Sequence, residues 1–83
     1  MEPYKWYSGN ELQQVDGYID CIIIYNPYGY QEMCIGRFTF EVKKTDSGIT
    51  LVPFWYGVFP SKAEIPQEDI VVWMPIEFPK EVS

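Results

Sequence analysis

Two turn motifs separate three runs of β-forming residues, and this punctuation constrains the fold of the 83-residue chain more than any other feature. The first motif is Asn26-Pro27-Tyr28-Gly29, in which proline presets φ and glycine accepts a positive φ. The second is Thr45-Asp46-Ser47-Gly48, a pattern typical of a hairpin turn with a glycine bulge. β-branched and aromatic residues dominate the flanking runs. The pattern therefore predicts antiparallel strands over residues 18–25, 30–43 and 49–58.

A fourth strand is predicted over residues 70–76, where Trp73 is expected to be buried and to anchor the chain end. Proline residues in the preceding segment, 59–69, leave room for one helical turn at most, and only residues 10–15 offer another short helix. Pro53 lacks an N–H, so the third strand should lie at an edge or carry a bulge, and the last strand should pair with the first strand or with another molecule. The expected fold is mainly β: a small antiparallel meander of three to four strands with at most one short helix and a proline-rich C-terminal tail, in a single domain over residues 1–83.

The two turns also predict strand registers. A first loop of two or four residues places Cys21 opposite Cys34, and a bulged second turn places Phe38 opposite Tyr56. Both registers collect apolar side chains on one face: Ile19, Cys21, Ile23, Cys34, Phe38, Phe40, Val42, Val52, Phe54 and Tyr56. The other face carries charged residues and also a second apolar set: Ile22, Ile24, Met33, Ile35, Leu51 and Trp55. That set is too apolar to be bare, so we expect the chain ends or a partner chain to cover it.

The charge balance narrows the classes of partner. Twelve Asp and Glu residues against six Lys and Arg residues give a net charge of −6, which disfavours direct binding to nucleic acid. The excess either keeps an aromatic-rich domain soluble or attracts a basic partner. No apolar run is long enough for a membrane span, and the first residues lack the layout of a signal peptide, so we expect a cytoplasmic protein without membrane contact.

Residues capable of catalysis or metal binding are few. The chain has no histidine, and two cysteines separated by twelve residues make a poor zinc set. Cys21 and Cys34 are therefore read as buried, reduced thiols rather than as a redox pair. Adjacent carboxylates such as Glu68 and Asp69 suit a solvated loop better than a pair of catalytic acids across a cleft. We expect no enzymatic activity, no cofactor and no metal site.

Tyrosines and acidic residues form the stronger candidate site. Tyr25, Tyr28 and Tyr30 cluster around the first turn, and Tyr side chains offer a large contact area with a polar end. Glu64, Glu68 and Asp69 lie in the loop before the final strand. Together these six residues are the predicted partner-binding residues. The alternative is that the tyrosine rings pack on one another and shield a small core.

Several short motifs resemble a known family. They are Trp6-Tyr7-Ser8, Glu11-Leu12, Gly17, Ile22-Ile23-Ile24, Ile35-Gly36-Arg37-Phe38 and Val72-Trp73-Met74-Pro75-Ile76. This arrangement resembles the small bacterial and phage family of unknown function numbered 551, whose members typically open with W-I-S-V and E-x-L-P and close with T-H-W-M-P-L-P. Gln13 and Val72 stand where that family usually has proline and histidine, and the middle of this chain is longer. The resemblance implies a phage or prophage-type genomic setting and carries no biochemical activity with it.

Two functions remain after these exclusions. The first is a phage-type protein-binding module, an accessory or inhibitor of a host or defence protein, that uses its acidic surface and exposed aromatic residues. The second is a structural accessory domain that forms a homodimer through Ile22, Ile24 and Ile35 or through an edge strand.

Overall fold

The computed structural model describes residues 2–12 and 17–77. Within these residues the chain forms six strands and one 3-10 turn. The elements are β1 (Tyr7–Ser8), β2 (Tyr18–Tyr25), β3 (Glu32–Thr45), β4 (Gly48–Phe59), β5 (Ala63–Ile65), the 3-10 turn η1 (Gln67–Asp69) and β6 (Ile70–Pro75). The mainly β expectation is confirmed, with the helical turn at η1. The residues described from the 10–15 segment are not helical, and its remainder lies outside the described residues, as does the end of the proline-rich tail from residue 78.

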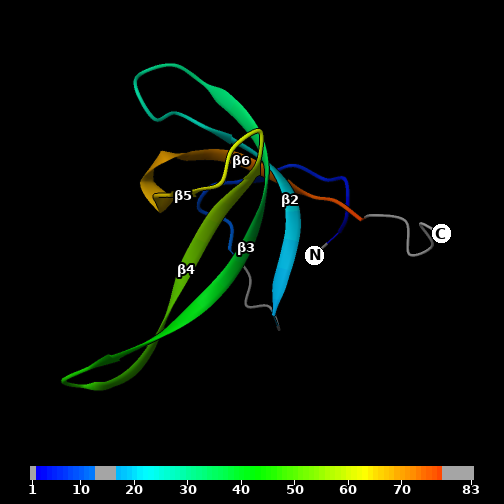
Figure 1. Ribbon diagram of the computed structural model, residues 1–83. Coiled ribbons are helices and arrows are strands. Elements are labelled where there is room, and N and C mark those ends of the chain that lie inside the picture. Colours follow the sequence, from blue (N-terminus) through cyan, green and yellow to red (C-terminus); the bar gives the residue numbers. More distant parts are fainter. Residues whose placement is uncertain (1, 13–16, 78–83) are drawn as a thin grey trace.

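All six strands of the described chain belong to one antiparallel sheet in the order β1-β6-β2-β3-β4-β5. The predicted meander is β2-β3-β4, and the last strand pairs with β2, one of the two expected alternatives. β4 is not an edge strand, because β5 pairs with it at Trp55–Gly57, but Pro53 lies outside these paired residues. β5 lies beyond β4, and the chain then returns through η1 to the opposite side of the sheet (Figure 1). The sheet is thus wider than the predicted three to four strands because two very short strands, β1 and β5, extend its edges.

The register between β2 and β3 differs from the prediction by two residues. Cys21 lies opposite Gly36, and Cys34 lies opposite Ile23, so the expected Cys21–Cys34 pair is wrong. The reason is the loop: residues 26–31 connect the strands, two more than the four-residue turn predicted. Because a shift of two residues preserves the alternation of side chains, both cysteines still project to the same face of neighbouring strands.

The register between β3 and β4 is offset from the prediction by one residue, and this reverses the faces of β4. Phe38 pairs with Trp55, where Tyr56 had been predicted, and Phe40 pairs with Pro53. Asp46 and Ser47 form a two-residue turn between Thr45 and Gly48, without the predicted bulge. Trp55 therefore enters the core, at 1% exposure, and the prediction that Phe54 and Tyr56 share the face of Phe38 is wrong.

Aromatic rings fill the centre of the core. Phe38 stacks on Trp55 with ring centroids 4.4 Å apart, and Trp73 lies 5.6 Å from Phe38 and 5.4 Å from Trp55. Tyr7 stacks on Trp73 at 5.2 Å, which attaches β1 to the core. The burial predicted for Trp73 is confirmed, since none of its surface is exposed. The remaining buried apolar residues are Cys21, Ile23, Cys34, Ile65 and Ile70.

A single side chain connects the two ends of the sheet. The side-chain oxygen of Gln67, on η1, accepts a hydrogen bond from the indole N–H of Trp55. Its side-chain nitrogen donates to the carbonyl oxygen of Gly9 at 2.6 Å, just beyond β1. Gln67 therefore joins β4 to the segment after β1.

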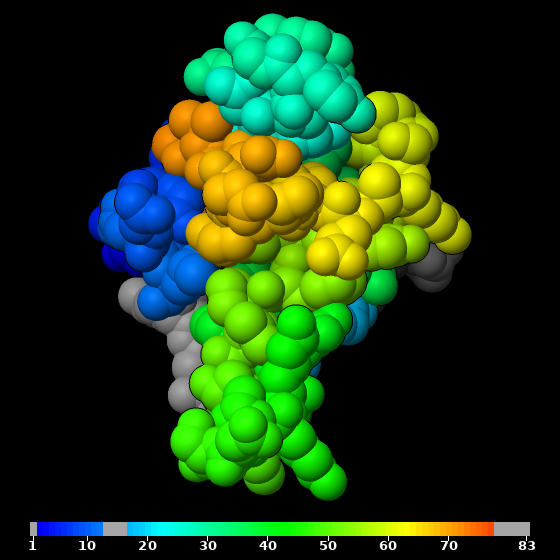
Figure 2. Space-filling view, turned by 90° about the vertical axis from the view of Figure 1, so that its left-hand side faces the viewer, coloured from blue at the N-terminus to red at the C-terminus, as the bar shows by residue number. Residues whose placement is uncertain are grey.

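The hairpin of β3 and β4 extends beyond this core as an arm (Figure 1; green tip in Figure 2). Every residue from Glu41 to Leu51 is exposed. Val42 and Leu51 pair on the face that continues the core face, and they are 63% and 43% exposed. The arm is thus held by strand pairing and has little apolar packing of its own.

Candidate functional site

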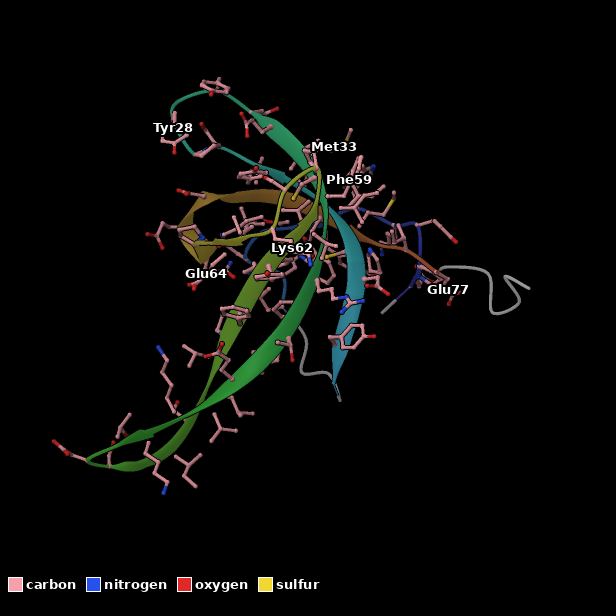
Figure 3. All side chains as sticks on the ribbon, viewed as in Figure 1. Tyr28, Met33, Phe59, Lys62, Glu64 and Glu77 are labelled. Carbon is pink, nitrogen blue, oxygen red and sulfur yellow. The ribbon has the colours of Figure 1, made fainter. Side chains whose placement is uncertain are left out.

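A surface cleft of about 360 Å³ lies between the β2–β3 loop and the segment that contains β5 and η1. We call it the acidic cleft and define it by its lining residues: Tyr25, Pro27, Tyr28, Glu32, Ala63, Glu64, Ile65, Pro66 and Asp69. Figure 2 shows the loop, in cyan, and the yellow segment around β5 on the same face of the molecule. Figure 3 shows Tyr28 and Glu64 on this side.

The cleft brings together four of the six residues predicted to bind a partner. Tyr25 and Tyr28 come from the end of β2 and its following loop, while Glu64 and Asp69 come from β5 and η1. A backbone hydrogen bond from the N–H of Asn26 to the carbonyl oxygen of Asp69, at 2.8 Å, holds the two segments together. Tyrosines and acids that are about forty residues apart in the sequence therefore share one concave surface.

The other two predicted residues lie outside the lining. Tyr30 is 55% exposed, and its ring centroid is 6.3 Å from that of Tyr28, so it stands beside the cleft. Glu68 is exposed on η1 and does not line the cleft, although the next residue, Asp69, does. These two residues serve as natural controls for Tyr28 and Asp69.

Glu32 was missed by the sequence analysis. The structure places it directly opposite Tyr25, and the Tyr25 hydroxyl donates a hydrogen bond to Oε2 of Glu32 at 3.1 Å. Burial raises the pKa of the Tyr25 phenol, and the hydrogen bond to Glu32 raises it further. Tyr25 thus stays protonated and holds the Glu32 carboxylate at the wall of the cleft. The correct first register would have identified Glu32, because it places the two residues opposite each other.

The acids of the cleft have no cationic partner among the described residues. Among the described residues, the ion pairs within 4 Å are Lys5–Glu2 and Arg37–Asp20, and neither involves a residue of the acidic cleft. Glu32, Glu64 and Asp69 therefore present three carboxylates beside two tyrosine rings. Carboxylates and the faces of aromatic rings both attract a cation, so the surface suits an Arg or Lys side chain.

A second concavity, of about 390 Å³, is almost wholly apolar. We call it the apolar groove and define it by its lining residues: Ile22, Met33, Cys34, Ile35, Phe59 and Pro60. Met33 and Phe59 are each 65% exposed and lie close together in Figure 3. The groove belongs to the face of Ile22, Met33 and Ile35, which is predicted from the sequence to be too apolar to be bare. In the described chain, Val72 and Met74 of β6 pair with Ile24 and Ile22 and extend this apolar face.

The cysteines are placed as buried, free thiols. Burial raises the pKa of Cys21 to about 12, and burial also raises the pKa of Cys34. Both thiols therefore resist ionisation at neutral pH. Residues 2–12 and 17–77 contain no group of three or more His, Cys, Asp or Glu side chains positioned to hold a metal ion. Over the same residues, no helix has the length and apolar character needed to cross a membrane.

Comparison of the chain with models of protein families, with curated proteins and with solved structures finds no significant match.

Proposed function

We propose that this chain is a non-catalytic protein-binding module that captures a basic segment of a partner protein in the acidic cleft. One observation carries the proposal: Tyr25, Tyr28, Glu32, Glu64 and Asp69 converge from three segments of the chain on one cleft of about 360 Å³. Their carboxylates form no ion pair within the described chain. A cationic side chain of a partner would supply the missing countercharge.

The cleft and the net charge act at different stages of binding. A net charge of −6 attracts a basic partner over a distance and speeds association, and this effect weakens as salt rises. Tyr28 is 81% exposed and can close over a bound side chain, which slows dissociation. Carboxylates at the wall of the cleft fix the position of the cation by charge-assisted hydrogen bonds.

Charge dependence is the first test. The probe is a fluorescent peptide of alternating arginine and glycine, and its control has glutamate in place of arginine. We expect the arginine peptide to bind, to bind more weakly as salt rises, and to lose about three- to tenfold in affinity with Asp69→Asn. The neighbouring Glu68→Gln removes a carboxylate of the same η1 turn and should change affinity by less than about twofold. Equal binding of the arginine and glutamate peptides would exclude the cleft as a site for cations.

Aromatic dependence is the second test. Tyr28→Ala should weaken binding of the arginine peptide by about two- to fivefold, the effect of one cation–π contact, mainly through faster release. Tyr30→Ala removes an exposed tyrosine from the same loop, outside the lining, and should leave the release rate unchanged. Stopped-flow fluorescence measures both rates. If Tyr28→Ala and Tyr30→Ala release the peptide equally fast, Tyr28 makes no contact in the cleft that slows dissociation.

The proposed setting is the cytoplasm of a bacterial cell, with the chain acting as an accessory or inhibitor of a host or defence protein. The support for a phage-type origin is the motif resemblance to the family numbered 551, especially Trp73-Met74-Pro75. The support for a reducing compartment is the pair of free, buried thiols, Cys21 and Cys34. The chemistry of the acidic cleft does not depend on this setting.

A second candidate function is self-association, and one observation favours it. Apolar side chains share the face of the sheet opposite the core across three neighbouring strands: Ile22, Ile24, Met33, Ile35, Val72 and Met74. A two-fold dimer could bury this face. Sedimentation at several concentrations separates the two functions. A tight dimer that Ile24→Lys dissociates would favour self-association, whereas a monomer at all concentrations would exclude it.

A further inference from the structure

One short stretch of β3 has a strand on only one side in the described chain. Glu32, Met33 and Cys34 pair with the end of β2. On the other side, pairing with β4 ends at Ile35–Phe59, after a register irregularity between Ile35 and Gly36. Beyond Phe59 the chain turns at a proline and enters β5, which pairs with β4 alone. Backbone groups at the start of β3 are therefore left without a strand partner, and such an edge is a template for an added strand.

Each side of this edge has its own concavity. Glu32 lines the acidic cleft, whereas Met33 lines the apolar groove. The chain from the end of β4 into β5 is divided in the same way: Phe59 lines the groove, and Glu64 lines the cleft. Figure 3 shows Met33 and Phe59 on one side of the sheet end, with Tyr28 and Glu64 on the other. Neighbouring side chains in a strand point to opposite faces, so an added strand would send alternate residues into the two sites.

We infer that the partner binds as an extended segment that pairs with the β3 edge at Glu32–Cys34 and alternates basic with apolar residues. Its basic side chains enter the acidic cleft, and its apolar side chains enter the apolar groove. This inference rests on the proposed function, and it adds the backbone conformation and the sequence pattern of the partner. Main-chain hydrogen bonds supply part of the affinity, and the two unlike sites select the sequence.

Charge decides between a foreign segment and a second copy of the chain. Pairing of two copies through this edge would bring two acidic clefts together, each with Glu32, Glu64 and Asp69. Each copy also carries a net charge of −6. A basic segment instead brings countercharge to carboxylates that have none within 4 Å in the described chain. The occupant is therefore a basic partner.

The test compares three peptides of equal length and charge. The first alternates arginine with valine, the second alternates arginine with glycine, and the third has the arginines and valines of the first in two separate blocks. We expect the alternating arginine–valine peptide to bind about tenfold more tightly than either of the others, because only this peptide fills both sites at once. Phe59→Ser should abolish the advantage of valine, while Leu51→Ser, an exposed apolar residue on the arm, should preserve it.

Backbone pairing is tested by N-methylation of the arginine–valine peptide. One version carries methyl groups on the arginine nitrogens and the other on the valine nitrogens. Because alternate N–H groups of a strand point to the same side, only one version should lose affinity, by about tenfold for two lost hydrogen bonds. Equal affinities for the two versions, or for the alternating and block peptides, would overturn strand pairing and leave the cleft proposal standing. If no arginine peptide binds better than its glutamate counterpart, both the cleft proposal and strand pairing fall.

Discussion

Replacing Gln67 with leucine tests whether the hydrogen bonds of this one side chain stabilise the fold. Gln67 accepts a hydrogen bond from the indole N–H of Trp55 and donates one to the carbonyl oxygen of Gly9. Leucine has nearly the same volume but can make neither bond. The change therefore removes the polar connection between β4 and the segment after β1 while leaving the space filled.

The expected cost follows from burial. Two hydrogen bonds contribute roughly 0.5–1.5 kcal/mol each, and leaving a buried donor unpaired costs about 1–3 kcal/mol. Trp55 is only 1% exposed, so water cannot easily replace the lost acceptor. We expect Gln67→Leu to lower the free energy of unfolding by about 2–4 kcal/mol. A domain of this size has roughly 4–12 kcal/mol in total, so the loss would lower the melting temperature by roughly 10–25 °C.

Urea denaturation followed by tryptophan fluorescence measures the change. Gln31→Leu is the matched control, since Gln31 is exposed in the β2–β3 loop, and its replacement should change stability by less than about 0.5 kcal/mol. An unchanged m-value would show that the two variants unfold from states of similar compactness. If Gln67→Leu lowers the free energy of unfolding by less than about 1 kcal/mol, the two hydrogen bonds of Gln67 do not stabilise the fold as argued.

Three further predictions concern the core. Trp73→Ala should lower stability by about 3–5 kcal/mol, measured by thermal unfolding, because Trp73 is fully buried; an unchanged melting temperature would contradict its anchoring role. Gly36→Ala should lower the free energy of unfolding by about 1–3 kcal/mol, because a Cβ at this position would lie 2.6 Å from a carbonyl oxygen of β4. Gly57→Ala is the control and should cost less in the same thermal unfolding assay, because the nearest atoms to its Cβ would lie at 3.4 Å. Cys21 and Cys34 should react with a thiol reagent at pH 8 only after unfolding. The raised pKa of Cys21 means that the folded state holds the thiol proton more tightly, so stability should fall as pH rises from about 9 towards 12, and a rise over that range would contradict it.

Local sequence signals predicted the strands of the central meander but not the exact pairing. The runs that became β2, β3 and β4 are β-branched and aromatic, and turn residues separate them, so propensity and tertiary structure agree. The face of Cys21 and Cys34 was also predictable, because a loop longer by two residues keeps the alternation. Trp55 was assigned to the wrong face because one residue in the second turn decides that alternation.

The short strands depend on tertiary contacts. β1 has two residues and β5 has three, too few for a periodic pattern to identify them. β1 forms because Tyr7 stacks on Trp73, and β5 forms because Ile65 lies opposite Trp55 in the core. Both partners were recognisable as large apolar residues, but only the folded sheet determines which segments reach them.

For the candidate site, too, the sequence decided one part and the tertiary structure another. The sequence by itself determined which residue types were candidates, because the tyrosines at one turn and the acids before the last strand are visible in it. Only the tertiary structure decided which of these residues meet: it added Glu32 and placed Tyr30 and Glu68 outside the cleft. The physical reason is that side-chain direction changes from one residue to the next in a strand or tight turn. Neighbours such as Glu68 and Asp69 therefore have the same charge and composition signal but face different surroundings once the chain has folded.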